Sequence, residues 1–91
     1  MSNLTTAERY FDAWNAHDAE AIAATFAQGG TYTDPTVAEL DAQATGAYAL
    51  SLVAAFPDLR FDLVSTAVTD DGCVAAQWVM RGTNTASFMA I

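Results

Sequence analysis

The sequence predicts one α+β domain in which three helices pack on one face of a curved antiparallel sheet. In the first half of the chain, apolar residues recur at intervals of three and four, as in amphipathic helices. Between residues 59 and 81 they alternate with polar residues, as in strands with one buried face. The 91 residues show no internal repeat and no linker, so residues 1–91 are expected to form a single domain.

Two helices are predicted in the first third of the chain. Thr5 and Glu8 form a capping box that would begin the first helix, which runs to about Ala16. Asp18 is a natural N-cap for a second, shorter helix that runs to about Ala27, where two glycines follow. The apolar residues expected to face the core are Leu4, Ala7, Phe11 and Trp14 in the first helix, and Ile22 and Phe26 in the second.

A short strand and a third helix are predicted next. Residues 31–34 are rich in Thr and Tyr, and Pro35 ends this run because it cannot donate to a central ladder. Residues 36–44 are expected to form a loop, although a helical turn is an alternative for them. Thr45 is expected to cap a third helix, which Pro57 ends. The apolar face of this helix carries Ala49, Leu52, Val53 and Phe56.

The alternation between residues 59 and 81 predicts a β-hairpin. Residues 59–65 form its first strand, and Asp70-Asp71-Gly72 supplies the turn. On the return strand, Ala76, Trp78 and Met80 are expected to share one face. Gly82 indicates a bulge or a strand end. Residues 83–91 are expected to form a loop or an interrupted strand.

The charge balance is strongly acidic. Eleven Asp and Glu residues face three arginines and no lysine, which gives a net charge of −8. Such a chain repels phosphate backbones and anionic lipid surfaces, so neither nucleic acid nor a membrane is an expected partner. The N-terminus lacks a charged region followed by an apolar stretch, and no apolar run is of bilayer length. A cytoplasmic location is expected.

The remaining reactive side chains are each predicted to have a structural role. Cys73 is the single cysteine, so no disulfide can form within the chain, and its apolar strand context predicts a core residue. His17, beside Asp18, is predicted to face solvent, and Arg81 to form a surface salt bridge. The sequence has no metal-ligand cluster, glycine-rich phosphate loop or Ser-His-Asp order, so neither a metal nor a cofactor is expected.

Four segments resemble motifs of a known family. Residues 10–22 resemble the opening of the ketosteroid-isomerase-like, or nuclear transport factor 2-like, superfamily, and residues 32–35 resemble its strand motif. Residues 55–59 and 81–85 resemble the SnoaL-like polyketide cyclase branch in particular. The segments follow the family's order over nearly the whole chain, which is therefore identified as a member.

This resemblance implies a cone-shaped α+β barrel with a ligand cavity at its open end. The family continues with further strands that close the cone and form much of its dimer face, so the C-terminal strands are expected to be missing here. The chain would then be a fragment of a longer product, a truncated form, or a subunit whose open edge a second copy covers. A homodimer or other self-association is expected, because an apolar chain with a small core tends to seek a partner surface.

Asp34 and Tyr10 are the candidate catalytic residues, both by resemblance to the steroid isomerases. Asp34 falls on the carboxylate that shuttles a proton beside a ketone, and burial in an apolar cavity is expected to raise its pKa. Tyr10 matches the tyrosine that donates a hydrogen bond to the developing enolate oxygen. Two structural alternatives stay open: Asp34 caps the turn before Thr36, and Tyr10 packs its ring in the core.

Four aromatic residues are the candidate ligand-binding residues, although each also fits a core position: Trp14, Tyr32, Phe56 and Trp78. The resemblance implies a SnoaL-like polyketide cyclase or isomerase-type enzyme, with cofactor-free acid/base proton transfer on a small cyclic carbonyl compound. The isomerases' third group, a protonated acid on a later strand, has no counterpart here. The alternative is a non-catalytic small-molecule-binding or structural subunit of the same fold. The expected partner is a small hydrophobic molecule.

Overall fold

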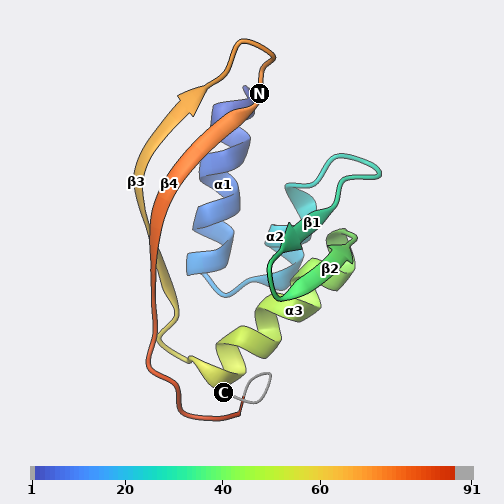
Figure 1. Ribbon diagram of the computed structural model, residues 1–91. Coiled ribbons are helices and arrows are strands. Elements are labelled where there is room, and N and C mark those ends of the chain that lie inside the picture. Colours follow the sequence, from blue (N-terminus) through green and yellow to red (C-terminus); the bar gives the residue numbers. More distant parts are fainter. Residues whose placement is uncertain (1, 88–91) are drawn as a thin grey trace.

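The computed structural model describes residues 2–87, and within them it contains three helices and four strands (Figure 1). In chain order these are α1 (Asn3–Asn15), α2 (Ala19–Ala24), β1 (Tyr32–Asp34), β2 (Val37–Leu40), α3 (Ala42–Ala55), β3 (Arg60–Val68) and β4 (Val74–Arg81). The α+β class is confirmed. The strands form two separate antiparallel pairs, β1–β2 and β3–β4, where the sequence predicted one curved sheet.

The first helix begins one turn earlier than predicted. Ser2, and not Thr5, is the N-cap of α1, and the Ser2 hydroxyl accepts a hydrogen bond from the Thr5 backbone N–H at 3.1 Å. The prediction of Asp18 as the N-cap of α2 is confirmed, since its carboxylate accepts from the Ala21 N–H at 3.1 Å. The second helix ends at Ala24, because the chain tightens there into bonds between residues three apart.

Two predictions for the middle of the chain are wrong. Residues 36–44 contain β2, which pairs with β1 in the register Tyr32↔Leu40. The N-cap of α3 is Asp41, whose carboxylate accepts from the Ala44 N–H at 2.8 Å. Thr45, predicted to be the cap, is fully buried and donates its hydroxyl proton to the Asp41 carbonyl oxygen at 2.8 Å. The end of this helix, just before Pro57, is as predicted.

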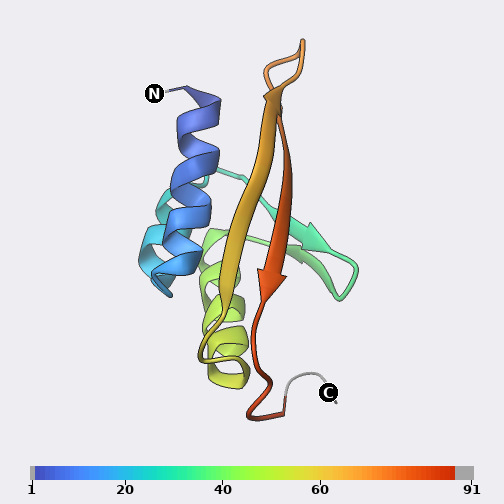
Figure 2. The same cartoon turned by 90° about the vertical axis from the view of Figure 1, so that its left-hand side faces the viewer.

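The predicted hairpin is confirmed and lies along α1 (Figure 2). Its register pairs Phe61 with Met80 and Leu63 with Trp78, and shifts between residues 63 and 65. Gly72 in the turn has a positive φ of 87°, a conformation that glycine adopts without strain. The second strand ends at Arg81, as Gly82 indicated, and residues 82–87 have no regular secondary structure. The part of the last predicted segment at residues 88–91 lies outside the described residues.

The core sits between the three helices and the first residues of β3. Its buried apolar residues are Ala13, Trp14, Ile22, Ala49, Leu52, Ala55, Leu59 and Phe61. Helix α2 packs on α3, and α1 packs on β3. Gly46 allows the first of these contacts, because a Cβ there would lie 2.9 Å from the Ala19 carbonyl oxygen. No helix within residues 2–87 is long and apolar enough to cross a membrane.

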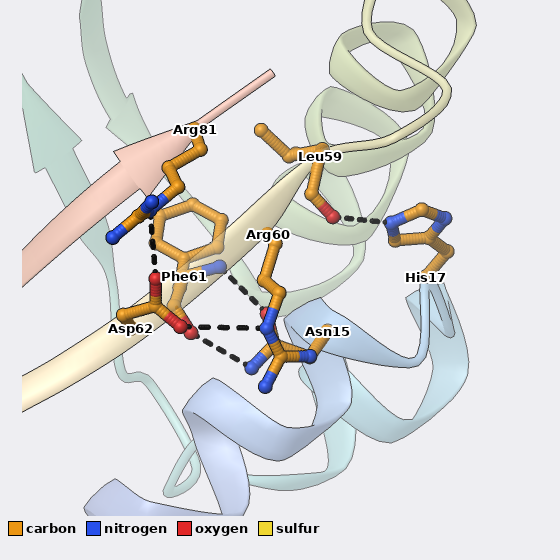
Figure 3. A network of polar contacts seen from close by, with 7 residues as sticks. All are labelled: Asn15, His17, Leu59, Arg60, Phe61, Asp62 and Arg81. Atoms are coloured by element: carbon orange, nitrogen blue, oxygen red, sulfur yellow. Dashed lines mark hydrogen bonds and ion pairs between the residues drawn. The ribbon is translucent and has the colours of Figure 1, made fainter.

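A group of polar contacts joins the end of α1 to the start of β3 (Figure 3). The Asn15 side-chain amide donates to the Phe61 carbonyl oxygen at 2.9 Å and accepts from the Phe61 N–H at 2.7 Å. His17 does not face solvent as predicted. Its backbone adopts a positive φ of 56°, and its Nε2 donates to the Leu59 carbonyl oxygen at 2.7 Å. Both contacts fix the angle between helix and hairpin.

Two further predictions concern the hairpin. Arg81 forms the expected surface ion pair, with its Nε 2.8 Å from the Asp62 carboxylate, and Arg60 contacts the same carboxylate at 3.4 Å (Figure 3). Cys73 is exposed, so its prediction as a core residue is wrong. It precedes the first residue of β4 and belongs to the turn.

Replacing Asn15 by Ala tests the helix–hairpin contact. The change leaves the Phe61 N–H and carbonyl without partners in a part-buried place, so we expect the free energy of unfolding to fall by about 1–3 kcal/mol. Urea unfolding measures this. The matched control is Asn3→Ala, which removes an exposed side-chain bond to the Gly72 carbonyl and should cost less. Equal losses in the two variants would contradict a special role for Asn15.

Candidate functional site

A cavity of about 590 Å³ opens between α1, β1, α3 and the hairpin. All six residues predicted as catalytic or ligand-binding line it: Tyr10, Trp14, Tyr32, Asp34, Phe56 and Trp78. Sequence reasoning gave no site role to Tyr48 or Phe61 and took Phe11 only for a core residue, yet these three aromatic residues line the same cavity. Tyr48, Leu52 and Phe56 are spaced by four along α3, and this spacing is the signal from which Tyr48 was predictable.

The aromatic side chains form a connected wall. Trp78 lies 5.2 Å from Phe61 and 6.0 Å from Phe11, measured between ring centroids, and both ring pairs are tilted. Tyr10 contacts Trp14 edge-on at 6.2 Å. Tilted and edge-on contacts are the favoured arrangements of aromatic rings. These contacts give the wall a defined shape. Trp78 belongs to it and is still 45% exposed.

Asp34 is the only charged residue among the described residues that line this cavity. It ends β1, and the turn at Pro35 directs the next two backbone N–H groups back to its carboxylate. Its Oδ1 accepts from the Thr36 N–H at 2.8 Å, the Thr36 hydroxyl at 2.7 Å and the Val37 N–H at 3.0 Å. Asp34 therefore does cap the turn before Thr36.

The second carboxylate oxygen of Asp34 accepts hydrogen bonds from two tyrosines. Its Oδ2 accepts from the Tyr32 hydroxyl at 2.6 Å and from the Tyr48 hydroxyl at 3.1 Å. The rings of these tyrosines are tilted, with centroids 5.8 Å apart. We call Tyr32, Asp34, Thr36 and Tyr48 the carboxylate cluster. It joins β1, the turn and α3 at the polar end of the cavity.

Hydrogen bonds decide the pKa of Asp34. Burial alone would raise this pKa, as the sequence analysis expected, but the hydrogen bonds from Tyr32, Thr36 and Tyr48 together outweigh burial and hold the pKa well below its usual range. The expectation of a raised pKa is therefore wrong. Asp34 is ionised at neutral pH, and in this arrangement it is a weak base.

The three tyrosines of the cavity stay neutral. Burial raises the pKa of Tyr32, and its hydrogen bond to the Asp34 carboxylate and the charge of that group raise it further. Burial also raises the pKa of Tyr48 and that of Tyr10. The nearby Trp14 indole N–H lowers the pKa of Tyr10, but by less than burial raises it. That N–H is buried without a hydrogen bond of standard geometry among the described residues.

No other charged group contributes to this cavity within residues 2–87. Arg60 and Arg81 contact Asp62 on the hairpin and do not line it. No group of three or more His, Cys, Asp or Glu residues in the same range is placed to hold a metal ion. A second cavity of about 590 Å³, lined by Tyr10 and Cys73 among others, has no charged residue in its described lining. Of these two cavities, only the aromatic one carries a charged group in its described lining.

A mostly aromatic cavity with one hydrogen-bonded carboxylate has the general form of a small-molecule site, with apolar walls and a few polar groups. The model of the SnoaL-like domain family matches residues 7–90, and the chain belongs to this family. The helices and antiparallel strand pairs are consistent with the nuclear transport factor 2-like fold to which that family belongs. No curated protein matches the chain.

Replacing Tyr32 by Phe tests the cause of the low pKa. The change removes the shortest hydrogen bond to Asp34 Oδ2, so we expect the pKa of Asp34 to rise. A carbon NMR titration of the side-chain carboxyl measures it. Tyr10→Phe is the matched control, because Tyr10 makes no hydrogen bond to Asp34, and it should move this pKa less. An unchanged pKa in Tyr32→Phe would contradict the assignment.

The hydrogen bond between Tyr32 and Asp34 also makes the stability of the fold depend on pH. Folding lowers the pKa of Asp34 below its unfolded value of about 3.9, so ionised Asp34 stabilises the fold above that pH. This stabilisation is lost as pH falls below that value towards the folded pKa. The cost of Tyr32→Phe in urea unfolding should therefore be largest near neutral pH and shrink below about pH 4.

Proposed function

We propose that this SnoaL-like domain binds a small, largely apolar molecule in the aromatic cavity. The observation that carries the proposal is the lining: eight aromatic side chains and one ionised carboxylate line the same cavity. The cavity volume of about 590 Å³ falls within the usual range of small-molecule sites, and such sites combine apolar walls with a few polar groups that fix orientation. The aromatic rings supply the binding area, and the carboxylate cluster orients the ligand.

A bicyclic ketone, 2-tetralone, is a suitable neutral probe. We expect it to raise the melting temperature, because a ligand that binds only the folded state stabilises that state. Met80 lines the cavity and is 42% exposed, so Met80→Trp should fill the space and abolish the rise. Val79→Trp is the matched control, since Val79 is 45% exposed on the other face of the same strand and does not line the cavity. Equal effects of the two variants would contradict binding in this cavity.

We propose as a second candidate a SnoaL-like cyclase or isomerase activity, by cofactor-free proton transfer on a cyclic carbonyl compound. The observation that favours it is that Asp34 and Tyr10 line one cavity, where a carboxylate and a phenol can face a ketone from two sides. This candidate has a condition. The ligand must displace a tyrosine hydroxyl from Asp34, because only a carboxylate with fewer donors is basic enough to take a carbon-bound proton.

Deuterium exchange separates the two candidates. A proton-transferring domain should speed the exchange of the protons beside the 2-tetralone carbonyl, and Asp34→Asn should abolish this because it removes the basic group. A binder should leave the exchange rate at its value in buffer. NMR follows exchange and binding in one sample, so a bound probe without faster exchange retires the catalytic candidate.

A further inference from the structure

The geometry of the carboxylate cluster points to an organic cation, an ammonium group on an apolar body, as the ligand of the aromatic cavity. This inference rests on the proposed small-molecule binding and deepens it. Three independent features of the cavity support it: the direction of the hydrogen bonds, the sign of the charge, and the chemistry of the walls.

The tyrosine hydroxyls of the carboxylate cluster already donate their protons within the cluster. Each phenol carries a single O–H. Tyr32 donates its proton to Asp34 at 2.6 Å, and Tyr48 donates to Asp34 at 3.1 Å while its oxygen also lies 3.1 Å from the Thr36 hydroxyl. A further group that meets the Tyr32 oxygen therefore finds lone pairs rather than a proton. At the carboxylate cluster, a ligand carbonyl has to break a charge-assisted hydrogen bond to gain a donor, whereas a positive group or an N–H does not. The polar end of the cavity is therefore an acceptor surface.

The charge of the site has one sign. Asp34 is the sole charged residue in the described lining, and its pKa lies well below neutral pH. The two arginines of the hairpin, Arg60 and Arg81, share the Asp62 carboxylate instead. The whole chain carries a net charge of −8, which adds a negative potential at the cavity. An anionic ligand finds no counter-ion here, and a cation does.

The walls suit a cation as well. Aromatic faces attract a positive group through their quadrupole, and a desolvated ammonium gains most from this. The ring of Phe61 contacts Trp14 edge-on and Trp78 at a tilt, with a centroid distance of 5.2 Å in each pair. The three rings therefore face in different directions around the cavity. An aromatic enclosure with a carboxylate at one end is a favourable setting for a methylated ammonium group.

The experiment compares two probes of the same shape. Benzyltrimethylammonium and neopentylbenzene differ only in a positive nitrogen in place of a neutral carbon. Fluorescence of Trp14 and Trp78, which both line the cavity, reports binding. We expect the cation to bind about tenfold more tightly or better. The anion 3-phenylpropionate should bind more weakly than either.

Charge variants locate the preference. Asp34→Asn should remove most of the cation preference, whereas Asp70→Asn removes one charge from the exposed turn and should preserve it. Should Asp34→Asn fail to fold, the wild-type comparison still decides. Equal or tighter binding of neopentylbenzene overturns the inference and leaves the proposed binding function intact. If none of the three probes binds, and 2-tetralone does not bind either, the proposed function falls with it.

Discussion

The Asp34 carboxylate gathers hydrogen bonds from four short pieces of chain: the strand before it, the turn after it, the start of β2 and the third helix. The β1–β2 ribbon is three residues long on one side and four on the other, too small to be stable by itself. The hydroxyl of Tyr48 ties this ribbon to α3 through Asp34. The hydrogen bonds to this one partly exposed group therefore hold the polar end of the cavity together.

These hydrogen bonds also set the chemistry of the cavity. The donors that hold Asp34 in place stabilise its charged form, so they lower its pKa and its strength as a base together. A carboxylate in an equally apolar wall with fewer donors would have a raised pKa and would suit proton abstraction. The hydrogen bonds that fix the position of Asp34 therefore also reduce its strength as a base. The resting site favours recognition of a positive or hydrogen-bond-donating group over removal of a proton from carbon.

Much of the fold and of the lining was predictable because both follow from periodicity. Helical spacing sets which face of α1 carries Tyr10 and Trp14, and strand alternation sets which face of β4 carries Trp78. The pKa of Asp34 was not predictable, because it depends on how many donors surround the carboxylate in space. Helix caps were predicted from local sequence. Where one segment holds two polar residues that can cap, such as Asp41 and Thr45, tertiary packing decides which of them is the N-cap.

The wall that β4 gives to the cavity is only partly covered. Trp78 and Met80 line the cavity and yet are 45% and 42% exposed, since the thin core of the domain covers only part of β4. A ligand in the cavity removes water from these two side chains, and so does any partner that packs against them. Two binding events that bury the same surface elements are linked, and linkage is reciprocal. A partner that tightens ligand binding must therefore be held more tightly by the liganded domain.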